Sequence, residues 1–404
     1  MKTFYRYRNM TEEGGFVEST MTGEDKNYDE IVKWDDLDID SRILRGIYAF
    51  GFEDPSPIQR KAILPMLDKK DIIAQAQSGT GKTAAFTIGA LSQIDLSSNT
   101  SQVLILSPTH ELTRQIATVI NGIGSMMSGL RVKVLVGGSS IDEDAESLKT
   151  VVPHIIVGCP GRVHDMMRRN YIDGHSFKLF IMDEADEMLS SGFKEQVYNI
   201  FQFFNRNIQV ALFSATLPTH IYSITSKFMR NPVKISVTPD KLTLEGIKQY
   251  YIAINDDRDK YDNLKKLYSF ITLSQCIIYS NSVKRVIDLY EAMKEDQFPV
   301  CAIHSSMDKV ERDEAFTEFR TGKARVLISS NVTARGIDIQ QVSTVINFDI
   351  PKDVHTYIHR IGRSGRWGRK GTAINFITRR DISKIKEIEQ YYNTQIEELP
   401  SNLT

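Results

Sequence analysis

The chain has 404 residues, of which 41% are hydrophobic and 25% are charged, and its formal net charge is −1. This length favours two domains of ordinary size, each able to bury its own core. The near-neutral charge excludes a protein that coats nucleic acid through an overall basic surface, so any such contact must come from a local patch. Because no apolar run approaches the length of a membrane span, we expect no membrane association.

The cysteines and the N-terminus indicate an intracellular protein. Cys159, Cys276 and Cys301 lie far apart and form neither a disulfide framework nor a metal-binding spacing. We therefore expect reduced, buried thiols. The N-terminus lacks an apolar segment of the signal-peptide kind, which leaves the cytoplasm as the expected location. Residues 1–30 are polar, and we expect a disordered or loosely packed arm there.

Beyond this arm, short apolar runs alternate with amphipathic stretches. The runs are near-continuously apolar, as buried parallel strands are, and helical periodicity lies between them, for example from Glu111 to Met126. This alternation predicts an α/β sheet with helices on both faces. The strand candidates of the first half are residues 71–76, 102–108, 132–138, 154–160, 178–184 and 209–216.

The alternation pauses at residues 239–246, a polar stretch with Pro239 and Gly246 that predicts a linker. We expect two α/β domains, residues 31–238 and 247–404, with a cleft between them. The second domain has strand candidates at 275–280, 299–305, 325–330, 343–350 and 371–377, and helix candidates at 283–295, 310–320 and 381–392.

The stretch AQAQSGTGKTAAF ends like a phosphate-binding loop between a strand and a helix. Gly79 and Gly81 would let backbone N–H groups point at phosphate oxygens at the start of the helix. Lys82 would reach the β- and γ-phosphates, and the Thr83 hydroxyl would bind Mg²⁺. Ala76 stands where the general pattern has glycine, and it fits if its φ is strand-like. The alternative is a glycine-rich turn without a ligand.

The stretch KLFIMDEADEM places Asp183 and Glu184 at the carboxyl end of a predicted strand, where α/β sheets bind ligands. Asp183 would hold Mg²⁺ through water, and Glu184 would act as general base for an attacking water. An acidic pair after a strand is alternatively a helix cap or a solvated turn. Earlier in the chain, the Gln59 amide can pair with adenine N6 and N7, and Phe52 can stack on the ring. A glutamine after a proline-rich turn is alternatively a plain surface residue.

A set of motifs in order carries a family resemblance. The chain resembles the DEAD-box RNA helicases of superfamily 2, and among them the eukaryotic translation initiation factor 4A subfamily, from about residue 34 onward. The resemblance implies two RecA-like domains, ATP and Mg²⁺ as cofactors, and RNA-stimulated ATP hydrolysis coupled to domain closure on single-stranded RNA and local duplex unwinding. The motifs are GFEDPSPIQ, AQSGTGKT, PTHEL, GG at 137–138, PGR at 160–162, DEAD at 183–186, SAT at 214–216, ARGID at 334–338 and HRIGRSGRWGRKG at 359–371.

The resemblance also implies roles for individual residues. Catalysis would use Glu184, Lys82, Arg360 and Arg363, the two arginines acting as arginine fingers from the second domain. Asp183 and Thr83 would handle the metal. ATP would be bound by Phe52, Gln59, Ala76, Gln77, Ser78, Gly79, Thr80, Gly81, Lys82, Thr83, Gly336 and Asp338. Domain closure would be coupled to ATP through Asp186, Ser214, Thr216 and His359.

The basic cluster of the second half has a plainer alternative. By spacing alone, Arg360, Arg363 and Arg366 fall near one face of a helix, and such a cluster is alternatively a solvated helix end.

Single-stranded RNA would be held by sugar and phosphate, so binding would tolerate sequence, depend on salt and sense the 2′-hydroxyl. Two departures from the family bear on its strength. His110 and Asn331 stand where the family usually has arginine and aspartate, so we expect one weaker phosphate contact and one lost charge. The implied RNA contacts are Pro108, Thr109, Gly138, Arg162, Ser330 and Gly336, with Arg335 as a further candidate.

Other functions remain open from the sequence. An ATP-gated RNA clamp needs the same closed state as a helicase, and the lifetime of the RNA complex distinguishes the two. A DNA translocase is disfavoured by the DEAD, PTHEL and HRIGRSGR sequences, and a pseudoenzyme by the complete set of catalytic residues. The resemblance suggests a monomer with an initiation-factor-like scaffold partner.

Overall fold

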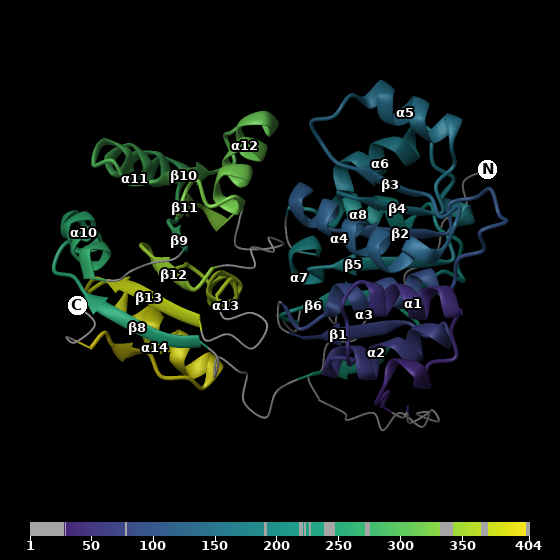
Figure 1. The fold of residues 1–404 in the computed structure, drawn as a ribbon, viewed down its shortest axis with the longest axis horizontal. Coiled ribbons are helices and arrows are strands. Elements are labelled where there is room, and N and C mark those ends of the chain that lie inside the picture. Colours follow the sequence, from purple (N-terminus) through teal and green to yellow (C-terminus); the bar gives the residue numbers. More distant parts are fainter. Residues whose placement is uncertain are drawn as a thin grey trace, which may run out of the picture.

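Two lobes, each built on one parallel sheet, make up the protein (Figure 1). The computed structural model describes residues 28, 30–76, 79–189, 192–217, 221, 224–225, 228–237, 247–270, 275–331, 342–364 and 371–400. The predicted arm falls almost wholly, and the predicted linker fully, outside these residues. Both stay predictions, as do the domain boundaries.

The first sheet has seven strands in the order β3-β4-β2-β5-β6-β1-β7, and every pair is parallel. Its strands are β1 Ile72–Gln75, β2 Val103–Leu106, β3 Val132–Leu135, β4 Ile155–Gly158, β5 Leu179–Asp183, β6 Gln209–Ser214 and β7 Val233–Ser236.

Helices cover both faces of this sheet. Its core splits into two clusters because successive strand residues point to opposite faces. Ile72 of β1 packs with α1 to α4, whereas Ile73 packs with α6 and α8. The helices are α1 Ser41–Ala49, α2 Pro57–Leu67, α3 Lys82–Leu91, α4 His110–Ile123, α5 Ile141–Thr150, α6 Pro160–Arg168, α7 Ala185–Met188 and α8 Lys194–Phe201, with 3₁₀ turns at η1 Trp34–Asp36, η2 Gly124–Met126 and η3 Gly174–Ser176.

The second sheet, also seven-stranded and parallel, has the order β10-β11-β9-β12-β13-β8-β14. Its strands are β8 Ile247–Ala253, β9 Cys276–Tyr279, β10 Val300–Ile303, β11 Val326–Ser329, β12 Thr344–Asn347, β13 Gly371–Ile377 and β14 Glu397–Glu398. Its helices are α10 Lys260–Phe270, α11 Val283–Glu295, α12 Lys309–Arg320, α13 Val354–Ile361 and α14 Ile382–Tyr392, with a 3₁₀ turn at η5 Asp257–Asp259.

The two sheets share one topology. When the strands of each domain are numbered from its own first strand, β8 takes the place of β1, β9 that of β2, and so on through both sheets. The predicted fold class, two α/β units of the same kind with helices on both faces, is confirmed. The predicted strands coincide with β1 to β6 and β9 to β13, whereas β7, β8 and β14 were not predicted.

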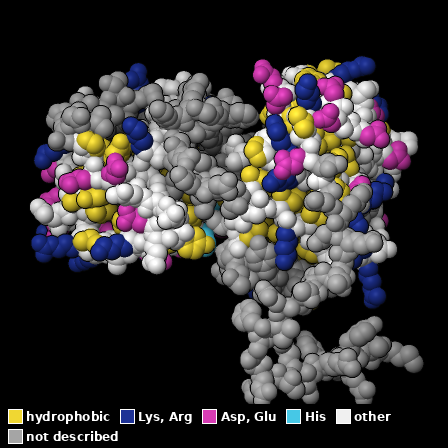
Figure 2. Space-filling model, turned by 90° about the horizontal axis from the view of Figure 1, so that it is seen from below, with side chains coloured by type: hydrophobic (Ala, Val, Ile, Leu, Met, Phe, Trp, Pro, Cys, Tyr) yellow, Lys and Arg dark blue, Asp and Glu magenta, His cyan; other side chains and the backbone are white. Residues whose placement is uncertain are grey.

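The surface and the thiols also agree with the sequence. On the face seen in Figure 2, basic and acidic side chains are interspersed over both lobes, in keeping with the near-neutral charge. Cys159, Cys276 and Cys301 are buried and free, and burial raises the pKa of each thiol above its ordinary value. In the part of the chain that the structure describes, no helix is both long and apolar enough to cross a membrane.

Candidate ATP and coupling site

The candidate site lies at the carboxyl edge of the first sheet. Strands β5, β6 and β1 are neighbours, so the segments that follow them meet at one edge. The phosphate-binding loop follows β1, Asp183 and Glu184 lie at the end of β5, and Ser214 ends β6 between them. Sheet order therefore brings together residues that are far apart in the sequence.

The described residues of the loop after β1 have the backbone expected of a phosphate-binding loop. The Ala76 N–H extends the strand ladder by donating to Ser214 O at 3.0 Å, and Ala76 is not among the non-glycine residues with positive φ. Alanine is accommodated here because the backbone is still strand-like. Gly79 and Gly81 do have positive φ, +81° and +94°. Gln77 and Ser78 lie outside the described residues.

Lys82 begins helix α3 and is buried at the foot of the loop. Its ammonium group donates to Ala76 O at 2.7 Å, which closes the loop on itself. Thr83 follows on the first turn of the same helix and is half-buried. Thr80 lies in the turn that precedes the helix. A bound phosphate would have to compete with the Ala76 carbonyl for the lysine.

Gln59 connects helix α2 to the phosphate loop. Its Oε1 accepts from Ser56 N at 2.6 Å in a capping box, and its Nε2 donates to Gly81 O at 3.1 Å. Phe52 is half-buried beside Phe50, with ring centroids 5.3 Å apart. The sequence predicted that Gln59 would pair with adenine. It did not predict the hydrogen bond from Gln59 to Gly81 in the loop, and the only sequence pattern that bears on the position of Gln59 is the Ser56-x-x-Gln59 capping box.

Asp183 and Glu184 form a buried acidic pair, each 3% exposed. Asp183 Oδ1 accepts from Glu184 N at 3.0 Å. Burial, together with the neighbouring Glu184 carboxylate, raises the pKa of Asp183, while Lys82 opposes this shift. Glu184 has φ +53° and ψ +50°, a left-handed conformation that is uncommon for a residue other than glycine. Such backbone outliers concentrate at functional sites, where the fold compensates their cost.

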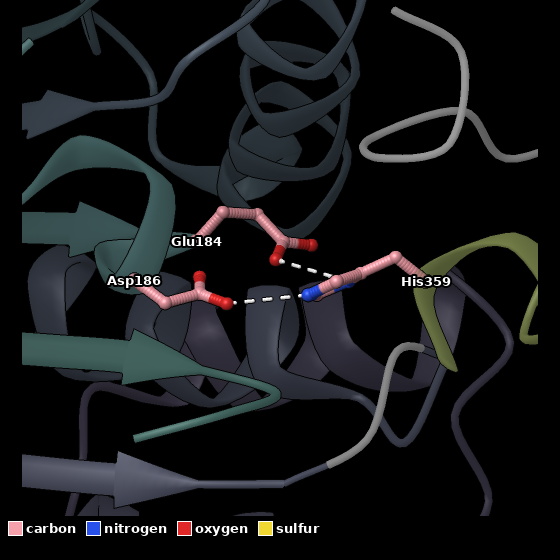
Figure 3. Close-up of side chains that lie close together, drawn as sticks. All are labelled: Glu184, Asp186 and His359. Atoms are coloured by element: carbon pink, nitrogen blue, oxygen red, sulfur yellow. Dashed lines mark hydrogen bonds and ion pairs between the residues drawn. The ribbon is translucent and has the colours of Figure 1, made fainter. Parts of the chain in front are cut away.

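The predicted coupling residues form one connected group across the two domains (Figure 3). Thr216 Oγ1 donates to Asp186 Oδ2 at 2.5 Å, and Thr216 N donates to Ser214 Oγ at 3.3 Å. From α13 of the second domain, His359 Nε2 lies 3.2 Å from the same Asp186 oxygen, and His359 Nδ1 lies 3.8 Å from Glu184 Oε2. Their role in coupling stays a prediction, but the structure brings all of these groups together.

The two predicted arginine fingers have different surroundings. Helix α13 ends at Ile361, so Arg363 lies in the following turn rather than on the helix face shared with Arg360, contrary to the spacing argument. Arg363 is buried and its Nε donates to His359 O at 3.2 Å, directly behind the interface histidine. Arg366 lies outside the described residues.

Arg360 has a guanidinium that is fully enclosed by residues of the second domain, and its role as an arginine finger stays a prediction. It donates to Asn331 Oδ1 at 2.6 Å, to Asn281 Oδ1 at 2.8 Å and to the backbone oxygen of Asp349 at 2.7 Å. The side chain is 0% exposed and stacks over Tyr279, 5.2 Å from the ring centroid. A guanidinium held in this way stabilises its own domain, and a phosphate contact would have to displace these bonds. No sequence pattern indicated the three asparagines that hold it, Asn281, Asn331 and Asn347.

The predicted RNA contacts lie along one edge of the first sheet. Pro108 and Thr109 follow β2, Gly138 follows β3 with φ +75°, and Arg162 follows β4. These three strands are neighbours, so the segments form a continuous strip. Ser330, a buried residue, follows β11 of the second domain.

Arg162 is engaged within its own domain. Its side chain, 8% exposed, forms an ion pair with Asp144 and donates to Ser139 Oγ at 2.9 Å. A phosphate contact from Arg162 would have to displace this pair, so its role in RNA binding stays a prediction. Gly336, Asp338 and Arg335 lie outside the described residues.

Comparison with known proteins agrees with this architecture. Residues 56–224 match the DEAD/DEAH box helicase family, and residues 259–368 match the helicase conserved C-terminal domain. The chain belongs to the DEAD-box helicases, and its two halves are the two RecA-like domains of that family.

Within the family it is of the initiation factor 4A type. It is 49% identical to eukaryotic initiation factor 4A of Caenorhabditis elegans, over 93% of this chain and 94% of that one. It is 51% identical to the ATP-dependent RNA helicase eIF4A of Scheffersomyces stipitis, over 93% and 95% of the two chains.

Solved structures define the domain arrangement that the chain resembles. Saccharomyces cerevisiae Dbp5 bound to RNA and ADP BeF3 superimposes with a TM-score of 0.85 at 35% identity, over 91% of this chain and 95% of that one. A point variant of Dbp5 bound to Nup159, a Gle1 variant, IP6 and ADP superimposes with a TM-score of 0.64 at 33% identity, over 90% of this chain and 96% of that one. Both structures match this chain over about nine-tenths of its length, and the RNA-bound one gives the higher TM-score.

Proposed function

We propose that this chain is an ATP-dependent RNA helicase that couples ATP hydrolysis to closure of its two domains on single-stranded RNA and so unwinds short duplexes locally. One observation supports this most strongly. His359 of the second domain reaches Asp186, which in turn accepts from Thr216 of the first domain. Residues of both domains therefore belong to one hydrogen-bonded group, which supports coupling between ATP state and domain closure.

The first domain would bind ATP. Phe52 and Gln59 would receive adenine, while the backbone N–H groups of the loop would hold the phosphates at the start of α3. Lys82 would exchange its bond to Ala76 O for the β- and γ-phosphates. The hydrogen bond to Ala76 O thus keeps the Lys82 side chain in position before a phosphate binds.

The residues around Asp183 suit Mg²⁺. Its carboxylate and the Thr83 hydroxyl are the oxygen ligands that this hard cation prefers. The raised pKa of Asp183 reflects buried negative charge that a divalent cation would offset. Asp183 would hold Mg²⁺ through water, with Thr83 as the other ligand, and the bound ion would neutralise charge on the phosphates.

Glu184 would take the proton of the attacking water through its buried carboxylate, which projects toward the second domain (Figure 3). Arg363 would supply positive charge to the transferring phosphoryl group, a contribution worth roughly 10³–10⁵ in rate. Since Arg363 comes from the other domain, hydrolysis would require closure. RNA that bridges the domains would favour closure, and ATP would raise RNA affinity by the same coupling.

RNA would lie along the strip formed after β2, β3 and β4 and continue to Ser330 on the second domain. Contacts from backbone and small side chains there address sugar and phosphate rather than base edges. Binding would therefore tolerate sequence and weaken with salt.

The decisive experiment is an ATPase assay of the full chain without nucleic acid, with single-stranded RNA and with single-stranded DNA. We expect stimulation by RNA alone. The matched control is Glu184→Gln, which keeps the shape of the side chain but removes the base, and should abolish the stimulated activity. Equal stimulation by DNA would contradict the RNA assignment.

The relatives named initiation factor 4A support a role in translation initiation. We further propose that the protein acts in the cytoplasm as a monomer together with a scaffold protein. Size-exclusion chromatography with light scattering tests the monomer, and capture of an initiation scaffold by the full chain tests the partner. A stable dimer or absence of any such complex would contradict these assignments.

A further inference from the structure

Two buried acceptor atoms face each other across the domain interface. Glu184 Oε2 and His359 Nδ1 lie 3.8 Å apart, on side chains that are 5% and 0% exposed. Neither atom has a hydrogen-bond partner among the described residues. Burying an unsatisfied carboxylate oxygen and ring nitrogen is unfavourable, so something that both can bind would stabilise this arrangement.

The orientation of the His359 ring is fixed from its other side. Asp186 Oδ2 lies 3.2 Å from Nε2, and a carboxylate can only accept, so Nε2 carries the proton. Thr216 holds the same Asp186 oxygen. In a neutral ring the Nδ1 lone pair then points toward Glu184 (Figure 3). A carboxylate behind a histidine is the arrangement that orients histidine ligands in metal sites.

The distance between Glu184 Oε2 and His359 Nδ1 suits a small divalent cation. Zinc binds histidine nitrogen and carboxylate oxygen at about 2.0–2.2 Å, so two ligands of one tetrahedral ion lie roughly 3.3 Å apart. The observed 3.8 Å requires only a small approach of two flexible side chains. One ligand atom from each of Glu184, Asp186 and His359 lies within 4.8 Å of the other two.

The donor set also discriminates between metals. Mg²⁺ prefers oxygen ligands and retains its water, whereas imidazole suits zinc and the later transition metals. Mg²⁺ would therefore occupy the all-oxygen position at Asp183 and Thr83. The Glu184–His359 pair would select a cation that accepts nitrogen.

We propose that Glu184 and His359 bind a Zn²⁺-type cation between them, with Asp186 orienting the histidine. The ligands come from different domains, so the site exists only when the domains are together. The bound ion engages the general base and links the two domains, and it therefore acts as an inhibitor that holds the closed form without ATP or RNA. Metal binding can be tested independently of helicase activity, because it is measured without ATP and without RNA.

The test is calorimetric titration of ZnCl₂ into the full chain without nucleotide, RNA or Mg²⁺. We expect one bound ion per chain, not displaced by excess Mg²⁺. Glu184→Gln and His359→Ala should each weaken binding by at least about tenfold, and Asp186→Asn by about 10–100-fold through loss of the orienting carboxylate. Thermal unfolding of each variant confirms that it is folded.

The matched control is His175→Gln, which removes an exposed histidine of the first domain and should leave zinc binding unchanged. A donor and an acceptor fluorophore, one on each domain, should report closure on adding zinc, reversed by a chelator. Absence of binding, or equal binding by Glu184→Gln and the wild type, would overturn the proposal. Loss of RNA-stimulated ATPase in the zinc-free wild type would contradict only the proposed function.

Discussion

Arg360 is a buried cation that is surrounded mainly by uncharged acceptors. Asn331, Asn281 and the Asp349 backbone oxygen receive its hydrogen bonds, and burial lowers its pKa to about 10. It therefore keeps its charge at neutral pH. This network joins the end of β11 to α13, the helix that carries His359, so we expect Arg360 to act on the site by positioning that helix.

Alanine substitutions of Arg363 and Arg360 should affect different properties of the protein. Arg363→Ala should lower kcat by roughly 10³–10⁵, as loss of an arginine finger would. Arg360→Ala should lower the free energy of unfolding by about 3 kcal/mol, because several buried acceptors lose their donor. Steady-state kinetics and thermal unfolding of both variants measure this. An Arg360→Ala variant with unchanged Tm and abolished kcat would support the arginine-finger prediction for Arg360.

Asn331→Asp should stabilise the protein. Asn331 is exposed and accepts twice from Arg360, so a carboxylate would turn hydrogen bonds between a cation and a neutral amide into an ion pair with little desolvation. We expect a gain of about 1 kcal/mol, or about 2–4 °C in Tm. Calorimetry of the full chain is the measurement, with Asn331→Ala as the matched control that should lose stability. A lower Tm for the aspartate variant would argue against this interpretation.

His110→Arg should tighten RNA binding. His110 starts α4 beside the predicted RNA strip, and its Nε2 would lie 3.3 Å from a Cβ added at Gly137. A permanent charge there should add up to about one unit to the slope of log affinity against log salt. Fluorescence anisotropy with single-stranded RNA over a salt series measures this slope. The control is His110→Gln, which should leave the slope unchanged. An unchanged slope for His110→Arg would mean that no phosphate lies near this position.

Much of the site was predictable at the residue scale because short motifs encode it. Ala76, Lys82 and Asp183 lie where strand ends and loop chemistry place them. The partners of Arg360 and Arg162 were not predictable, because they depend on which side chains the tertiary fold brings within reach. Spacing alone put Arg360 and Arg363 on one helix, and it could not reveal that α13 ends between them.

Among the elements, α1 is set against α4 and η2 by a close backbone approach. A Cβ added at Gly46 would lie 1.8 Å from Ile123 O, a backbone atom that cannot move aside. Gly46→Ala should therefore destabilise the first domain by about 1–3 kcal/mol through overpacking. Urea unfolding measures this. The control is Gly192→Ala, where an added Cβ meets nothing within 4 Å. Equal stability of the two variants would show that α1 can shift freely.

The strands that the sequence missed share a physical cause. The predicted strands are almost entirely buried and so nearly continuous in apolar residues. Strand β7, at the edge of its sheet, is partly exposed, β8 alternates in burial beside the predicted linker, and β14 has only two residues. Exposed side chains and short length remove the apolar signal on which strand prediction rests.

At the scale of the whole molecule, Arg114 of α4 and Asp313 of α12 form a second bridge between the domains, 2.9 Å long. Both side chains are partly exposed, so the pair contributes about 0.2–1 kcal/mol to the closed form. Arg114→Ala and Asp313→Ala should each weaken RNA binding with a non-hydrolysable ATP analogue by up to about fivefold.

The double variant is the control for this pair. The loss of RNA affinity in the double variant should be smaller than the sum of the losses in the two single variants, because only one interaction is removed. Anisotropy measurements of all three variants and the wild type complete the cycle. Fully additive losses would mean that the residues do not interact in the RNA-bound form.

Gln59 and Gly81 impose a constraint on how this protein can change over generations. Any side chain at position 81 would collide with Gln59, since an added Cβ would lie 2.5 Å from its Nε2, while loss of Gln59 leaves the Gly81 carbonyl without its donor. The residue that would recognise the base thus also shapes the loop that would hold the phosphates. A substitution of Gln59 that changes base recognition should therefore also change the conformation of the phosphate loop.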